Sequence, residues 1–234
     1  MLGQALERLP SAISGAIIDD TYGLTPLTRL TGTGRWLARP VEVPGSLPLE
    51  FEAGDRLTEK MRTWPTEHVA KCLVAYDPHH PAELRGAQEA ALIALQNSAN
   101  ATNRRWLLEV IPPDFANNPS LVAQSVEQLY RVGLFPTWWK LPALESLEHW
   151  REIARIVRKC DPYCAGVIVL GLDQPLAELT PKLQFAKDSG IGVGFAIGRS
   201  IWRQPAEQWF AKKINDQDVI TLIEREFKGV LAVW

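Results

Sequence analysis

The chain has 234 residues, of which 46% are hydrophobic and 22% are charged, and its formal net charge is -2. This length fits one domain, residues 1–234, with a large core, and the nearly neutral charge offers no basic surface for nucleic acid. No stretch reaches the roughly 20 apolar residues that a membrane span needs, and three cysteines cannot form a disulfide framework. We therefore expect a cytoplasmic protein without nucleic-acid or membrane partners.

Two kinds of segment alternate along the chain. The first residues have the apolar spacing of the end of a helix. Short apolar runs typical of buried strands follow at residues 15–19, 36–43, 68–76, 106–111, 137–141, 166–170 and 192–197. Helical spacing occupies residues 81–99, 120–132, 146–157, 175–186, 205–211 and 216–233. Strands buried on both faces that alternate with amphipathic helices indicate βα units around a parallel sheet.

Seven such units with short connections favour a (β/α)8 TIM barrel, an α/β fold, over a doubly wound open sheet. No Gly-x-Gly-x-x-Gly motif follows an early strand, which argues against a dinucleotide-binding fold. Eight strands are expected and seven are found, so the barrel is either complete in another way or lacks its first strand. A missing strand would leave two open sheet edges, and we therefore expect a homo-oligomer or an N-terminal segment that covers the gap.

Three ionisable residues interrupt consecutive apolar strands: Lys71, Glu109 and Lys140. Burying a lone charge costs several kcal/mol unless it is paired or neutralised, so these residues suggest one shared polar site. A desolvated lysine beside a second cation and a carboxylate suits Schiff-base catalysis. The alternative is structural: the lysines reach solvent, or they form a buried salt bridge with Glu109.

The last strands end in a second pattern that suits an anion. Gly198 and Arg199 lie between the final strand and a helix, and Gly171 and Asp173 follow the strand before it. Phosphate sites of such barrels commonly use these two loops. The alternative is that Arg199 pairs with Asp173. The neighbouring histidines at 79 and 80 have no third ligand at a recognisable spacing, so we expect no metal site.

Seven segments in the same order resemble class I aldolase barrels. The resemblance is greatest to the aldolase-like domain fused to the 5-dehydro-2-deoxygluconokinase of bacterial inositol catabolism, and it extends more distantly to tagatose-bisphosphate aldolases. The segments that carry it are residues 15–23, 39–42, 69–74, 108–113, 138–141, 166–171 and 194–199.

The resemblance implies a site and a reaction. Lys140 would be the Schiff-base lysine, and its catalytic partners would be Lys71, Glu109 and Asp19. The groups that would bind the phosphorylated substrate are Glu42, Gly171, Gly198 and Arg199. The implied reaction cleaves a phosphorylated keto sugar acid, 2-deoxy-5-keto-gluconate 6-phosphate, to dihydroxyacetone phosphate and malonate semialdehyde, without a metal or cofactor.

Two other functions remain open. The chain could be a non-catalytic barrel that binds a sugar phosphate or accompanies a sugar kinase of the same pathway. It could also be an isomerase or epimerase in which Glu109 and Lys71 transfer protons.

Overall fold

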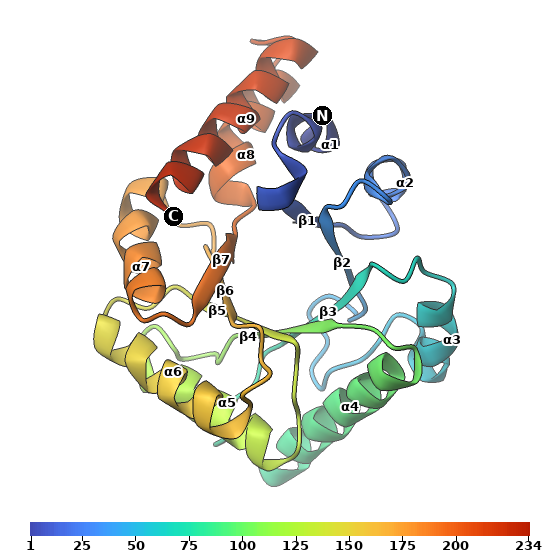
Figure 1. The fold of residues 1–234 in the computed structure, drawn as a ribbon, viewed down its shortest axis with the longest axis vertical. Helices are drawn as coiled ribbons and strands as arrows, with labels where there is room; N and C mark the ends of the chain where they lie inside the picture. Colours follow the sequence, from blue (N-terminus) through green and yellow to red (C-terminus); the bar gives the residue numbers. More distant parts are fainter.

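A computed structural model describes all 234 residues, and its centre is one sheet of seven parallel strands in sequential order (Figure 1). The strands are β1 (Gly15–Ile17), β2 (Trp36–Pro40), β3 (Val69–Val74), β4 (Trp106–Val110), β5 (Trp138–Pro142), β6 (Val167–Leu170) and β7 (Gly192–Ala196). The sheet curves into a barrel that is nearly closed. The predicted TIM-barrel fold is therefore confirmed, with seven strands in place of eight.

Helices surround the sheet on its outer side (Figure 1). They are α1 (Leu2–Glu7), α2 (Leu24–Leu30), α3 (Leu57–Arg62), α4 (Ala82–Ala101), α5 (Ser120–Arg131), α6 (Leu147–Cys160), α7 (Leu176–Asp188), α8 (Arg199–Phe210) and α9 (Asp216–Val233), with 3₁₀ turns at Ser11–Ile13 and Gly54–Arg56. None of these helices has the length and apolar character that crossing a bilayer requires.

Successive side chains of each strand point to opposite faces of the sheet, so the two faces pack against different residues. Outward-facing residues such as Cys72, Leu108 and Trp139 belong to the large core beneath the helices. Inward-facing residues form a smaller apolar cluster of Ala38, Val69 and Leu107, against which Ile17, Trp36, Trp138 and Ile168 pack. The rings of Trp36 and Trp138 meet edge to face, with centroids 5.6 Å apart. This inner cluster is the apolar floor of the barrel.

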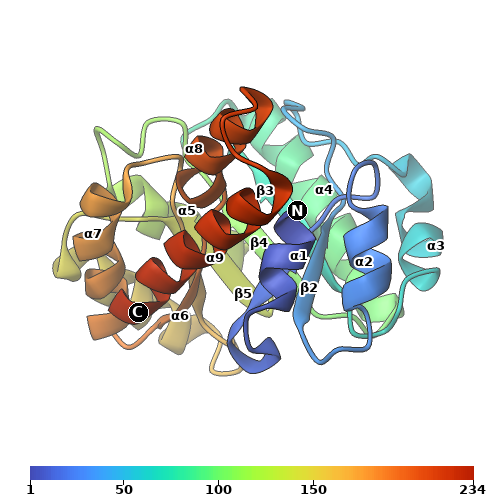
Figure 2. The ribbon, with the colours of Figure 1, turned by 90° about the horizontal axis from the view of Figure 1, so that it is seen from above.

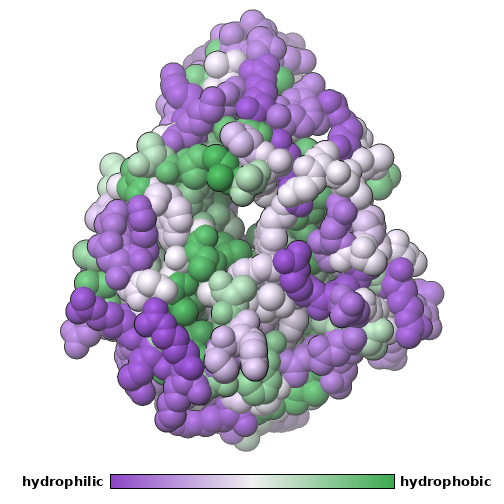
Figure 3. Space-filling view, viewed as in Figure 1, coloured by the Kyte–Doolittle hydropathy of each residue, from purple (hydrophilic) through white to green (hydrophobic).

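The sheet is open between β1 and β7, which do not pair. The helical layer closes outside this gap, since α1 packs beside α9 (Figure 2) and Arg8 donates a hydrogen bond of 3.2 Å to Thr221. The space-filling view along the barrel is hollowed near its centre, on the side where the two edge strands face each other (Figure 3). On this face of the molecule, an opening therefore lies beside the unpaired edges.

Candidate functional site

Four ionisable side chains gather above the apolar floor. Lys71, Glu109 and Lys140 each follow an inward-facing floor residue by two positions, so they point to the same side of their strands. Glu42 follows Pro40, the last residue of β2, by two positions. Only 5–8% of each of the four residues is exposed. The alternation that builds the floor therefore also places this quartet at the carboxyl ends of β2 to β5.

The quartet is one continuous chain of ion pairs. Glu109 joins the two lysines: its Oε2 lies 2.9 Å from Nζ of Lys71, and its Oε1 lies 2.9 Å from Nζ of Lys140. Glu42 Oε1 accepts a second hydrogen bond from Lys71. The predicted meeting of Lys71, Glu109 and Lys140 is thus present in the structure, and its contacts are also those of the buried salt-bridge alternative.

Burial and neighbouring charges act differently on the two lysines. Burial would lower the pKa of Lys71, but the carboxylates of Glu109 and Glu42 outweigh it and raise the pKa above its ordinary value. Burial also lowers the pKa of Lys140; Glu109 opposes this effect, the Lys71 ammonium adds to it, and the pKa lies below its ordinary value. Lys140 is therefore the amine that more readily loses its proton.

Glu109 stays a carboxylate in this arrangement. Burial would raise its pKa, but the ammonium groups of Lys140 and Lys71 hold the pKa below the ordinary value of a glutamate. The site thus contains an amine with a lowered pKa, an ammonium group and a carboxylate within hydrogen-bond distance of both. Nucleophilic attack on a carbonyl, and the proton transfers that follow it, require these three groups.

Asp19 lies apart from the quartet. It is exposed, and its Oδ1 accepts hydrogen bonds from the backbone N–H groups of Thr21 and Tyr22, so it shapes the turn after β1. No ion pair joins it to either lysine. The neighbouring Asp20 belongs to a separate pair of contacts, with Arg39 and with Lys60 at 2.8 Å. That cluster faces outward between the sheet and α3.

The predicted phosphate-binding residues lie at the ends of β6 and β7. Gly171 is buried, whereas Gly198 and Arg199 are exposed at the start of α8. There the carboxylate of Asp173 forms ion pairs with two arginines, Arg199 at 3.7 Å and Arg203. The alternative that Arg199 pairs with Asp173 is thus observed.

Arg203 was missed because the sequence predicted a helix from residue 205, whereas α8 begins at Arg199. The spacing of four residues from Arg199 would have placed both arginines on one helix face.

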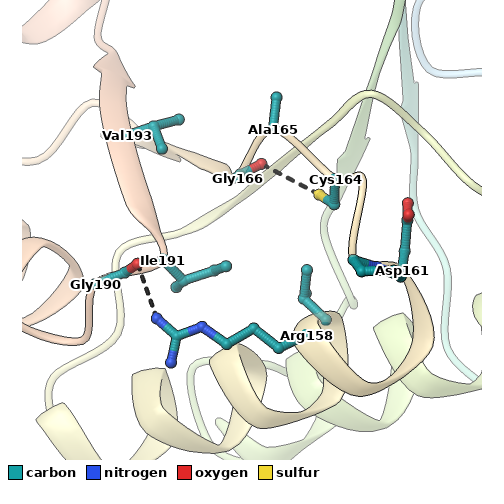
Figure 4. A pocket seen from close by; sticks show the side chains of 10 residues that line it. Arg158, Asp161, Cys164, Ala165, Gly166, Gly190, Ile191 and Val193 are labelled. Atoms are coloured by element: carbon teal, nitrogen blue, oxygen red, sulfur yellow. Dashed lines mark hydrogen bonds between the residues drawn. The ribbon is translucent and has the colours of Figure 1, made fainter.

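Another cavity, of about 360 Å³, lies at the opposite end of the barrel, where β6 and β7 begin (Figure 4). Its polar groups already have partners: Arg158 donates to the carbonyl of Gly190 at 3.0 Å, and the Cys164 thiol contacts the carbonyl of Gly166 at 3.8 Å. The Arg158 contact joins α6 to the segment before β7, and the Cys164 contact lies within the loop before β6. We therefore assign this cavity a structural role.

The fold is shared with solved aldolase structures of low sequence identity. An archaeal fructose-1,6-bisphosphate aldolase, described with its catalytic lysine covalently bound to the carbinolamine intermediate of the substrate, superposes with a TM-score of 0.64 at 10% identity, over 98% of this chain and 81% of that one. The fructose-bisphosphate aldolase of Slackia heliotrinireducens gives 0.60 at 11%, over 96% and 76%. A putative fructose-1,6-bisphosphate aldolase of Coccidioides immitis gives 0.60 at 14%, over 99% and 84%.

At these identities the likeness establishes the fold alone. Among curated proteins, no sequence matches this chain. A sequence profile does match residues 4–234, nearly the whole chain, and it describes a set of uncharacterized proteins conserved in bacteria. The chain belongs to this bacterial family, DUF2090.

Proposed function

We propose that the protein is a class I aldolase that uses Lys140 as its Schiff-base lysine. The observation that carries the proposal is the shared carboxylate of Glu109, which lies 2.9 Å from the amines of both Lys71 and Lys140. A single buried carboxylate between two lysines lets one amine become neutral while the other stays charged. The fold shared with fructose-bisphosphate aldolases supports the same reaction class.

The proposed cleavage begins at Lys140. The neutral amine of Lys140 attacks the substrate carbonyl carbon, and the π electrons move to the oxygen, which takes a proton from the Lys71 ammonium. Loss of water gives an iminium ion. Glu109 then accepts the proton of the substrate hydroxyl, the C–C bond breaks, and its electrons flow into the iminium to form an enamine. The Lys71 ammonium stabilises negative charge that develops on the carbonyl oxygen.

We propose as the substrate class a phosphorylated keto sugar acid such as 2-deoxy-5-keto-gluconate 6-phosphate. The sequence resemblance supports this class. The exposed start of α8, where Arg199 lies 3.7 Å from Asp173, offers a guanidinium that a phosphate could recruit in place of the carboxylate. The resemblance also supports action in the same pathway as a sugar kinase.

A coupled assay tests the proposal. The purified protein is given 2-deoxy-5-keto-gluconate 6-phosphate and, separately, fructose 1,6-bisphosphate, and release of dihydroxyacetone phosphate is followed as NADH oxidation by glycerol-3-phosphate dehydrogenase. We expect turnover in the wild type, background rates in Lys140→Met, and unchanged turnover in Lys159→Met, which removes an exposed lysine of α6. Wild-type turnover in Lys140→Met would contradict the assignment.

A second function, a non-catalytic sugar-phosphate-binding barrel, is favoured by one observation. Asp173 already occupies Arg199 and Arg203, and Asp19 makes only local contacts. A sugar phosphate that raises the melting temperature of the protein but is not turned over would support this non-catalytic function. Deuterium incorporation from solvent into the substrate without cleavage would instead indicate an isomerase or epimerase.

A further inference from the structure

The two lysines of the site are nearly equivalent with respect to Glu109. Each amine lies 2.9 Å from one of its oxygens. The side chains of Lys71 and Lys140 are also similarly buried, with 8% and 11% exposed. Nothing in the contact with Glu109 decides which amine should carry the proton and which should be free to react.

Glu42 breaks this equivalence, because it contacts Lys71 and not Lys140. Its Oε1 accepts a hydrogen bond from Lys71, and its Oε2 accepts one of 3.2 Å from the backbone N–H of Val41. With both oxygens occupied and 8% of the residue exposed, Glu42 is fixed against Lys71.

The backbone around Glu42 is fixed as well. The N–H of Val41 also donates to the carbonyl of Lys71 at 3.0 Å, and the N–H of Glu52 donates to the carbonyl of Val41 at 3.0 Å. Glu42 and Phe51 form an antiparallel bridge that folds the loop after β2 back on itself. The carboxylate therefore has little freedom to leave Lys71 for Lys140 or for solvent.

We infer that Glu42 is a positioning residue that selects Lys140 as the nucleophile by holding Lys71 in its ammonium form. The catalytic meaning of this inference rests on the proposed aldolase function. The asymmetry of the contacts themselves does not depend on that function.

The charge balance shows what Glu42 contributes. With Glu42 present, two carboxylates face two amines, and Lys71 contacts both carboxylates while Lys140 contacts one. The first proton to leave is therefore that of Lys140. Without the Glu42 charge, one buried carboxylate faces two equivalent amines and can compensate the positive charge of only one ammonium. The other amine loses its proton, and this unprotonated amine is found on Lys71 in some molecules and on Lys140 in others.

Competitive acetylation measures this division without any substrate. The protein is treated with trace acetic anhydride over a range of pH, and the modification of the peptides that carry Lys71 and Lys140 is quantified by mass spectrometry. We expect Lys140 to react at least about tenfold faster than Lys71 near neutral pH in the wild type, because two carboxylates hold the Lys71 amine as an ammonium and only one contacts Lys140. In Glu42→Gln the ratio should fall toward one.

Two further variants separate charge from structure. Glu42→Asp keeps the carboxylate and should retain most of the wild-type ratio, while Glu50→Gln neutralises an exposed residue of the same loop and should leave the ratio unchanged. A wild-type ratio in folded Glu42→Gln overturns the inference. Should that variant fail to fold, the wild-type profile decides: Lys71 becoming reactive at lower pH than Lys140 also overturns it.

Borohydride trapping with dihydroxyacetone phosphate links the inference to catalysis. In the wild type we expect the adduct on Lys140 alone, and in Glu42→Gln on both lysines. An adduct confined to Lys140 in both proteins overturns the inference and leaves the proposed function standing. If the wild type forms no adduct while the acetylation ratio responds to Glu42→Gln, the proposed function fails and the role of Glu42 in protonation stands.

Discussion

At the scale of single residues, Glu109 holds the site together, because each of its oxygens binds one lysine. Both contacts are buried, so solvent screens them little. Removing one partner of a buried ion pair is costly because the other charges lose their compensation, whereas the pair as a whole adds little to stability. The stability of the quartet therefore depends on all of its members being present.

The change Glu109→Gln tests this dependence. It leaves Lys140 without an ion-pair partner and Lys71 with Glu42 alone. We expect the free energy of unfolding at pH 7, measured by urea denaturation, to fall by about 3–5 kcal/mol. Glu127→Gln, at a more exposed ion pair of α5, is the matched control and should change the value by less than about 0.5 kcal/mol. Equal effects of the two substitutions would show that the Glu109 contacts are not buried as described.

The same carboxylate predicts a dependence on acid. Because the pKa of Glu109 is lower in the folded protein than its ordinary value of 4.5, its ionisation contributes stability above that value, and this contribution is lost as the pH falls through the folded pKa. The stability difference between the wild type and Glu109→Gln should therefore shrink as the pH is lowered from 7 to below 4.5. A difference that is constant with pH would mean that the pKa of Glu109 is not depressed.

Sequence reasoning reached the three strand residues of the site because strand periodicity carries that information. An ionisable residue two positions after an inward-facing apolar residue must lie on the same face of its strand, as Lys71, Glu109 and Lys140 do. The partner of Glu42 could not be predicted this way, because Glu42 lies beyond the end of β2, where the loop path decides its direction. The pairing of Asp173 with Arg203 was hidden for a similar reason, the unrecognised first turn of α8.

At the scale of secondary-structure elements, the strands and the long helices were predicted because their apolar periodicity is strong. The helices α2 and α3 were not, since they have only 7 and 6 residues and short helices give little periodic signal. The start of α8 was placed late because Pro205 resembles a first-turn proline, whereas it lies inside the helix.

Two glycines near the edge of the sheet are expected to differ in their tolerance of a side chain. Gly166, just before β6, has a φ of +119°, and a Cβ there would come within 2.4 Å of Val193. Gly194 in β7 has no atom within 4 Å of the corresponding position. Gly166→Ala should destabilise the protein by about 1–3 kcal/mol, and Gly194→Ala by less than about 0.5 kcal/mol, as measured by urea denaturation. The reverse order would contradict the described geometry of this edge.

At the scale of the whole molecule, the open side of the barrel sets the pattern of local stability. The residues of β1 are all partly exposed, and those of β7 are partly exposed or exposed, whereas every residue of β4 is buried. Strands with unpaired edges and few buried contacts open more easily than central ones. The sequence predicted this gap from the count of strands, but it could not show that α1 and α9 close the helical layer outside it.

Hydrogen exchange tests this pattern. We expect the amides of β1 and β7 to exchange faster than those of β3 to β5 in dilute protein. The unpaired edges lead us to propose self-association, in which case exchange in β1 and β7 should slow as the protein concentration rises. Uniform protection across the seven strands in dilute protein would show that another segment pairs with these edges.

The most direct test of the whole account is to identify the lysine that forms a Schiff base. The protein is reduced with borohydride in the presence of dihydroxyacetone phosphate, and the modified peptide is located by mass spectrometry in the wild type, Lys140→Ala and Lys71→Ala. We predict a stable adduct on Lys140 in the wild type and no adduct in Lys140→Ala. An adduct that persists in Lys140→Ala and disappears in Lys71→Ala would contradict the assignment of the nucleophile.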